Sequence, residues 1–155
     1  WVNAHTDRAF GNPTQDPFVS THRAFGQFSY ASQLNEQEGQ WRTDFTCQWI
    51  GAQRLPLTTE NPEAFQRPDI APDFFQINAQ VTRQFSPEFS IYAGVENALN
   101  YKQDRPIIAG DYDLESVSQT DFDQYFDASL VYGPIFGRML YAGLRWGILT
   151  PKVND

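Results

Sequence analysis

The stretch GRMLYAGLRWGI, residues 137–148, decides the fold of this chain. With the two-residue period of a β-strand, its side chains divide into two faces of different character. One face is apolar throughout and consists of Leu140, Ala142, Leu144, Trp146 and Ile148. The other face mixes methionine, tyrosine, glycine and arginine. This pattern predicts a strand with an apolar environment on one side only, either in a soluble sandwich or in a membrane barrel.

Composition narrows the class of protein further. The 155 residues carry a formal net charge of −8, and the absence of a basic stripe argues against nucleic acid as a partner. Aromatic residues make up 15% of the chain, more than one modest core uses, so some rings are expected to be exposed or interfacial. Cys47 is the single cysteine, so no intrachain disulfide can form. No apolar run approaches the ~18 residues that a membrane-spanning helix requires.

The same alternation recurs along the chain and predicts about five long strands. The alternating segments are residues 22–32, 41–52, 75–82, 89–100 and 137–148. The third and fourth segments are separated only by the Ser-Pro-Glu turn at 86–88, which predicts a β-hairpin.

The connections between these segments alternate in length. Short polar turns are expected at 86–88 and 33–40, and long connections at 53–73 and 101–136. Four prolines in 53–73 predict a loop without regular sheet or helix. Residues 1–20 are also expected to form a loop. Within the last long connection, Phe126 to Tyr132 is expected to extend a strand. Short connections at one end and long ones at the other predict an antiparallel up-and-down meander.

Strand length favours a membrane barrel over a sandwich. Soluble strands usually run 3–10 residues, whereas a tilted membrane strand needs about 9–11. The face formed by Gln76, Asn78, Gln80 and Thr82 is polar without being highly charged, as a barrel lumen is. Aromatic residues fall near the expected strand ends: Trp41, Trp49, Phe85, Phe89, Tyr101 and Trp146. Such rings suit the interfacial girdles of a barrel, although they could also close the ends of a soluble core.

Two runs resemble a known family. Residues 89–100, FSIYAGVENALN, are similar to the penultimate strand of TonB-dependent outer-membrane receptors, with matches at Gly94, Val95, Asn97 and Asn100. Ala-Leu follows Asn97 where the family usually has Leu-Phe. The final run, 137–146, resembles the last strand of that family, which often begins with Gly-Arg. The spacing Gly143-x-x-Trp146-x-Ile148 is similar to the C-terminal assembly signal of outer-membrane barrels.

Two further segments, 48–56 and 127–138, are similar to receptors of the Bacteroidetes type. The resemblance covers roughly residues 22–149. It departs from the family at the tail, 149–155, because the family usually ends on or just after its terminal aromatic strand.

The resemblance implies an all-β chain, residues 1–155, that forms the C-terminal part of a transmembrane β-barrel. Its plug domain and earlier strands would lie outside this sequence, since about eight strands are the minimum for a closed barrel. The family lies in the bacterial outer membrane and imports a scarce ligand, such as a metal chelate, vitamin or glycan. Its partners are membrane lipid, the other barrel strands, the plug, the inner-membrane TonB complex and a small-molecule ligand. No enzymatic activity and no cofactor are implied.

Two other functions are compatible with the same strands. The chain could be a barrel subunit with a structural or docking role in an outer-membrane assembly. It could also be a soluble β-sandwich binding module with aromatic platforms.

The outer loops supply the candidate ligand contacts. Arg67, Asp69 and Asp73 lie in the proline-rich connection and are predicted to contact ligand at the outer mouth, or else to tie the loop internally.

An acidic segment is the candidate metal site. Asp111, Asp113 and Glu115 alternate along it and offer carboxylate oxygens of the kind that hold Ca²⁺. A solvated acidic loop is the alternative.

The remaining candidates are weaker. His5, Asp7 and His22 could bind a transition metal but lack ligand spacing. Glu96, on the polar face, is expected to form a salt bridge to the plug or a neighbouring strand. Cys47 is expected to be a small hydrophobe on the lipid-facing side.

Overall fold

The computed structural model describes residues 5–6, 14–110 and 117–147 of the chain. The chain divides into two compact units. The first, which we name the loop unit, comprises Trp1–Ala24, Trp49–Phe75 and Tyr101–Gly137. The second, which we name the sheet unit, comprises Phe25–Gln48, Gln76–Asn100 and Arg138–Asp155.

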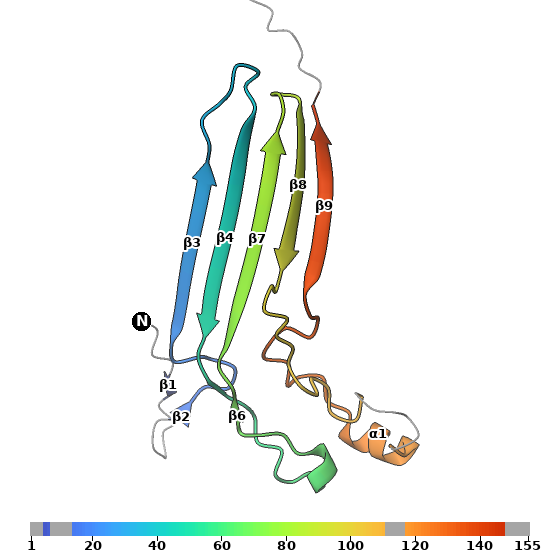
Figure 1. The fold of residues 1–155 in the computed structure, drawn as a ribbon. Helices are drawn as coiled ribbons and strands as arrows, with labels where there is room; N and C mark the ends of the chain where they lie inside the picture. Colours follow the sequence, from blue (N-terminus) through green and yellow to red (C-terminus); the bar gives the residue numbers. More distant parts are fainter. Residues whose placement is uncertain (1–4, 7–13, 111–116, 148–155) are drawn as a thin grey trace, which may run out of the picture. The chain divides into compact units, whose positions relative to one another are not determined.

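Five long strands form one sheet in the order β3-β4-β7-β8-β9. They are β3 (Arg23–Ala31), β4 (Gln40–Ile50), β7 (Phe74–Gln84), β8 (Phe89–Glu96) and β9 (Met139–Trp146). Their directions alternate across the sheet, which makes it an up-and-down meander (Figure 1). The predicted all-β antiparallel meander is therefore confirmed. The sheet is open, with β3 and β9 at its two edges.

The register of the last three strands aligns their side chains in rows. Val81 pairs with Ala93, and Ala93 pairs with Ala142. Together with the alternation along each strand, these rows define what we name the apolar face. On β7, β8 and β9 it carries Ala79, Val81, Arg83, Phe89, Ile91, Ala93, Val95, Leu140, Ala142, Leu144 and Trp146.

The side chains of this apolar face are exposed or half-buried, and none is buried. Leu140, Leu144 and Trp146 expose 79%, 65% and 78% of their surface, and Ala142 is also exposed. Because these four residues occupy alternate positions of β9, they lie on one face of the strand. Ile148, the fifth member, lies outside the described residues.

The opposite face, which we name the polar face, is packed by a reciprocal pair of tyrosines and glycines. Tyr92 lies opposite Gly143, and Tyr141 lies opposite Gly94. Each tyrosine ring covers the glycine across from it, so closely that a methyl group on either glycine would overlap the ring. The Tyr141 hydroxyl also hydrogen-bonds to Oε1 of Gln80 at 3.1 Å. These contacts link β7, β8 and β9 on the face that the sequence predicts to be polar.

A turn built on asparagines ends β8. Asn97 and Asn100 both have left-handed backbone angles, with φ of 49° and 58°, which asparagine tolerates better than most residues. The Asn97 N–H donates to Oδ1 of Asn78 on β7 at 3.0 Å. The Arg138 N–H donates to Oδ1 of Asn100 at 2.8 Å, just before β9. This asparagine joint ends β8 earlier than the predicted residue 100.

The loop unit contains more regular structure than its sequence predicts. Its connection 53–73 was expected to lack sheet and helix, and that prediction is wrong. β5 (Gln53–Arg54) pairs with β6 (Ile70–Ala71), and a 3₁₀ turn, η1, covers Glu63–Phe65. The pairing closes the proline-rich segment into a hairpin-like loop. It is possible because the prolines lie between and beyond the paired residues, and none occupies a paired position.

Two other expectations about the loops are corrected. Residues 126–132 form no strand beyond an isolated bridge between Asp127 and Ile108, and a helix, α1 (Gln119–Tyr125), precedes them instead. Within 1–20, β1 (His5–Thr6) pairs with β2 (Thr14–Gln15). Among the described residues, no helix has the length and apolar character needed to cross a membrane.

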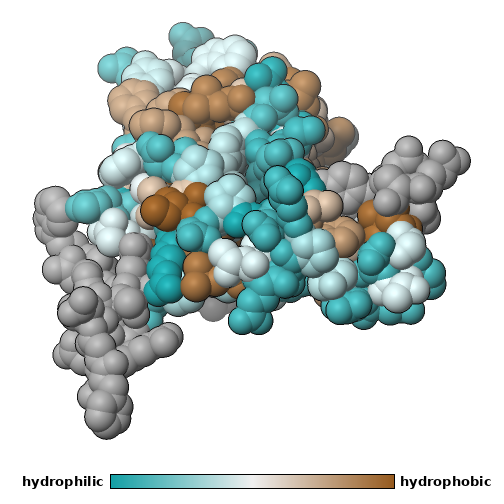
Figure 2. Space-filling view, turned by 90° about the horizontal axis from the view of Figure 1, so that it is seen from below, coloured by the Kyte–Doolittle hydropathy of each residue, from teal (hydrophilic) through white to brown (hydrophobic). Residues whose placement is uncertain are grey.

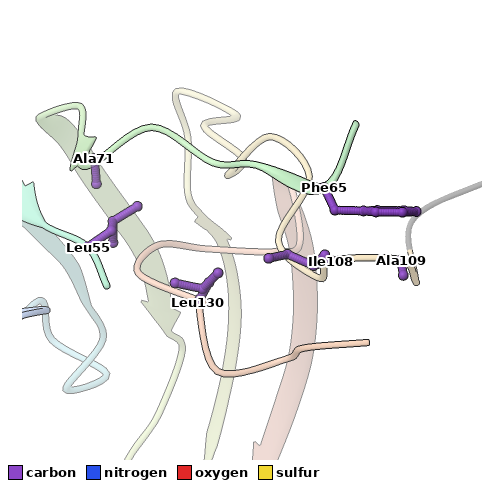
Figure 3. Close-up of a cluster of buried hydrophobic side chains, with 6 residues drawn as sticks. All are labelled: Leu55, Phe65, Ala71, Ile108, Ala109 and Leu130. Carbon is purple, nitrogen blue, oxygen red and sulfur yellow. The ribbon is translucent and has the colours of Figure 1, made fainter. Parts of the chain in front are cut away.

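The buried hydrophobic core lies in the loop unit. Figure 3 shows its six members: Leu55, Phe65, Ala71, Ile108, Ala109 and Leu130. They come from two connections that are distant in sequence, and the Phe65 ring stacks on Tyr125 with centroids 5.1 Å apart. All six members belong to the loop unit.

Candidate ligand-binding loops

The predicted contact residue Arg67 is a brace inside the loop unit. Its guanidinium donates to three backbone carbonyls, those of Gln66 at 3.1 Å, Arg105 at 3.1 Å and Ile107 at 3.3 Å. Two of these acceptors lie in the other long connection. Because carbonyl groups occupy these donors, Arg67 holds two loops together rather than presenting an open cationic fork.

Arg105 completes this brace in the opposite direction. Its Nη2 donates to the carbonyl of Ala64 at 2.8 Å, across the same boundary between connections. Thr58 fixes the backbone beside the brace, since its hydroxyl accepts from the Arg67 N–H at 2.8 Å. Both arginines therefore join connection 53–73 to connection 101–136.

Asp73 orients an aromatic side chain. Its Oδ2 accepts from Nε1 of Trp49 at 3.0 Å, and the indole lies 6.5 Å, centroid to centroid, from the Phe75 ring. Because Asp73 and Phe75 both hold it, the indole has a defined position.

Asp69 lines a shallow hollow of about 390 Å³ in the loop unit. Its own carbonyl accepts from the Leu55 N–H at 2.7 Å, which holds the loop in place beside β5. Seven residues surround the hollow: Thr21, Ala52, Gln53, Arg54, Leu57, Asp69 and Ile70. An acidic residue, a basic residue and two exposed aliphatic residues around one hollow suit a small ligand with polar and apolar parts.

A larger hollow of about 580 Å³ lies beside the indole of Trp49. It is lined by that residue and by the continuous segment 18–24, which includes His22 and Arg23. The His22 ring is positioned by a 3.0 Å hydrogen bond between its Nδ1 and the Thr21 hydroxyl. The sequence did not predict this hollow, because it depends on the close approach of Trp49 to a distant segment.

In the view from below, hydrophilic and hydrophobic side chains are interspersed (Figure 2).

The three predicted contact residues thus have separate roles. Arg67 braces, Asp73 orients an indole, and only Asp69 lines a hollow. The contacts described for Arg67, Asp69 and Asp73 are made with other residues and not with one another. What the loops offer chemically is non-covalent binding by aromatic, charged and aliphatic groups.

The predicted metal sites receive no structural description. Asp111, Asp113, Glu115 and Asp7 lie outside the described residues, as does the side chain of His5. Within the part of the chain that is described, no three histidine, cysteine, aspartate or glutamate side chains are grouped as metal ligands.

The predicted residues of the strands have simple surroundings. Glu96 is exposed at the end of β8, opposite Met139. Cys47 is half-buried on β4 and is a free thiol.

Gln103 is the loop anchor that the sequence did not predict. It is buried, its Nε2 donates to the Leu130 carbonyl at 2.9 Å, and its Oε1 accepts from the N–H groups of Tyr132 and Gly133. Burial and a hydrogen bond to Tyr101 raise the pKa of Tyr132 beside it. A lone glutamine in a polar loop carries no sequence signal for such a role, because its partners lie about thirty residues away.

Comparison of the chain with protein-family models, with curated proteins and with solved structures found no match.

Proposed function

We propose that this chain is the C-terminal part of the β-barrel of a TonB-dependent outer-membrane receptor, which imports a scarce small-molecule ligand. The proposal includes lipid around the apolar face and further barrel strands at the edges of β3 and β9. It also includes a plug domain that couples the receptor to the inner-membrane TonB complex. The loop unit would contribute to ligand recognition.

One observation carries this proposal: large apolar side chains on one face of the sheet are exposed, while tyrosines on the opposite face pack over glycines. In a soluble protein, the apolar face of a sheet is buried against a second layer. Here Leu140, Leu144 and Trp146 are mostly exposed, while Tyr92 and Tyr141 pack over glycines on the polar face. That inversion is what a barrel with lipid outside and a polar interior requires.

Strand length and the open edges support the same proposal. β4 and β7 have 11 residues each, which suits a tilted strand that crosses a bilayer. Unpaired backbone groups at a sheet edge are costly in lipid and prone to aggregation in water, so β3 and β9 need neighbours. Further strands of the same barrel would supply them.

The positions that carry the family resemblance also have physical roles in this sheet. Gly94 makes room for the Tyr141 ring, and Gly143 makes room for Tyr92. Asn97 and Asn100 form the joint between β7, β8 and the start of β9. Residues in demanding backbone and packing positions are those that a family pattern retains, which supports the assignment.

A charge placed on the apolar face tests the proposal. Ala142 lies in the middle of β9 and is exposed, so Ala142→Arg removes no packing and introduces one charge. In lipid, arginine near the bilayer midplane costs about 2–4 kcal/mol, whereas on a water-exposed surface the change stays within about 0.5 kcal/mol. Urea unfolding of the intact protein in lipid vesicles, followed by tryptophan fluorescence, measures this difference.

Gln37→Arg is the matched control, because Gln37 is exposed in the short turn between β3 and β4. It should leave the free energy of unfolding unchanged. Equal, small effects of both substitutions would contradict a lipid-facing sheet. Recovery of the intact protein from cells in a soluble fraction without detergent would contradict it independently and would favour a sandwich.

A further inference from the structure

We propose that Arg83 binds the phosphate group of a phospholipid at the bilayer surface on the side of the short turns. The inference rests on the proposed membrane location of the apolar face and adds a specific lipid contact to it. The ligand is a lipid phosphate, and the site consists of the Arg83 guanidinium and its two aromatic neighbours, Trp41 and Phe85.

Arg83 is a cation on an otherwise apolar surface. It pairs in register with Ile91, which pairs in turn with Leu144, and both of these neighbours are exposed aliphatic residues. Its guanidinium carbon lies 5.1 Å from the centroid of Trp41 and 5.4 Å from that of Phe85. Two rings therefore hold the cation by cation–π attraction, which fixes its position.

The guanidinium donors of Arg83 are not used within the described chain. A guanidinium has five N–H donors. The aromatic rings beside Arg83 offer these donors no oxygen acceptor, whereas a carboxylate would offer two. Across the described residues, no hydrogen bond or ion pair of the Arg83 side chain is found, whereas the side chains of Arg67 and Arg138 donate to backbone carbonyls. A positioned cation with free donors fits a phosphate, which guanidinium groups bind with two parallel hydrogen bonds.

The position of Arg83 along the sheet matches the depth of lipid headgroups. Phe85 lies two residues closer to the turn than Arg83, and its N–H donates to the Phe89 carbonyl. Phe89 pairs in turn with Trp146. The rings of Phe85, Phe89 and Trp146 contact one another in sequence, at 5.6 Å and 6.0 Å. A row of aromatic side chains marks the interface of a barrel, and arginine side chains near it extend their charge to the headgroups.

Arg145 provides a matched comparison within the same sheet. It lies one row from Arg83 but on the polar face, where its guanidinium carbon is 5.0 Å from the Tyr92 centroid. The two residues thus share residue type, cation–π contact and height along the strands. They differ in the face that they occupy, so only Arg83 should meet lipid.

Native mass spectrometry of the intact protein in mixed micelles tests the inference, with phosphatidylglycerol as the probe. Arg83→Gln should weaken retention of the lipid about five-fold, the factor that one basic side chain near an anionic membrane surface contributes. Arg145→Gln should leave retention as in the wild type. Arg83→Lys, which keeps the charge but loses the two-pronged hydrogen bond, should fall between them. Excess inorganic phosphate should not displace the lipid.

Two results would overturn the inference. One is wild-type retention by Arg83→Gln, and the other is an equal loss in Arg145→Gln. If Arg83→Gln fails to fold, Arg83→Lys decides: unchanged retention with unchanged salt dependence would contradict a hydrogen-bonded phosphate. Failure of the intact protein to enter membranes at all would instead refute the proposed function, so the two failures are distinguishable.

Discussion

The reciprocal packing of tyrosine over glycine leads to a prediction about two substitutions that look equivalent in sequence. Both Gly94→Ala and Gly143→Ala add one methyl group beneath a tyrosine ring on the polar face. Their surroundings differ in one respect. The added carbon at Gly94 would overlap the Tyr141 ring and also lie 2.9 Å from the backbone oxygen of Ala79. At Gly143, the nearest atoms all belong to the Tyr92 side chain, with Cζ at 2.6 Å.

The magnitudes follow from what each neighbour can do. Overpacking in a well-packed region costs about 1–3 kcal/mol, and a backbone oxygen in a paired strand cannot move aside. We expect Gly94→Ala to lower the free energy of unfolding by about 2–3 kcal/mol, at the upper end of that range. Tyr92 can rotate away from Gly143 at the loss of its cation–π contact with Arg145, so Gly143→Ala should cost about 1 kcal/mol.

Urea unfolding of the intact protein in lipid vesicles measures both values. The decisive comparison uses backgrounds in which the covering tyrosine is replaced by alanine. With Tyr92→Ala present, Gly143→Ala should no longer be destabilising, since its three nearest atoms belong to the Tyr92 ring and hydroxyl that are removed. With Tyr141→Ala present, Gly94→Ala should still cost about 1 kcal/mol, because the Ala79 oxygen remains.

Gly26→Ala on β3 is the control. A methyl group there would meet no described atom within 4 Å, so the substitution should be neutral or stabilising by about 0.5 kcal/mol. The reasoning is refuted if Gly94→Ala behaves as Gly26→Ala does, or if removal of either tyrosine relieves both glycine positions equally.

Three further predictions concern the joint and the loops. Asn97→Ala should cost about 1–2 kcal/mol because alanine disfavours a left-handed φ, whereas Asn97→Gly should cost less; urea unfolding of both variants checks this, and equal losses would contradict it. Arg67→Ala should cost about 1–2 kcal/mol and speed amide exchange at Ile108, with the exposed Lys102→Ala as a control that changes neither. The raised pKa of Tyr132 means that the folded loops hold the phenol proton more tightly than the unfolded chain does, so stability should fall as pH rises above the unfolded value of 10.0. Tyr132→Phe should remove this fall in stability. Alkaline unfolding of both proteins, monitored by circular dichroism, measures it, and an equal fall in Tyr132→Phe would contradict the prediction.

The strands could be predicted from the sequence because their two faces differ along the whole length of each strand. Alternation predicted a strand through Leu140, Ala142 and Leu144, and the structure has this strand as β9, paired antiparallel with β8. The ends of the strands could not be predicted as well. β8 ends at Glu96, because the next residue, Asn97, has a left-handed φ and a hydrogen bond to the Asn78 side chain, and neither is visible in hydrophobic periodicity.

Most of the loop structure that the sequence analysis missed depends on contacts between segments that are distant in sequence. The residues 126–132 alternate as a strand would, but they pair only at Asp127, and their neighbours are loop residues rather than a sheet. The helix α1 did have a local signal, Ser118 followed three residues later by Asp121. The Ser118 hydroxyl accepts from the Asp121 N–H at 3.1 Å, as an N-cap does. The Arg67 brace and the Gln103 anchor had none, because both depend on contacts between distant segments.

The six-residue core of the loop unit has a consequence for engineering. Three of its members come from the connection between β4 and β7, and three from the connection between β8 and β9. Neither connection contains a complete core of its own, and Arg67 and Arg105 cross between them in both directions. A library that diversifies one loop, or a graft that moves it to another scaffold, would remove three of the six core residues against which the other loop packs. The two loops therefore form a single evolvable unit, in which changes to one select for compensating changes in the other.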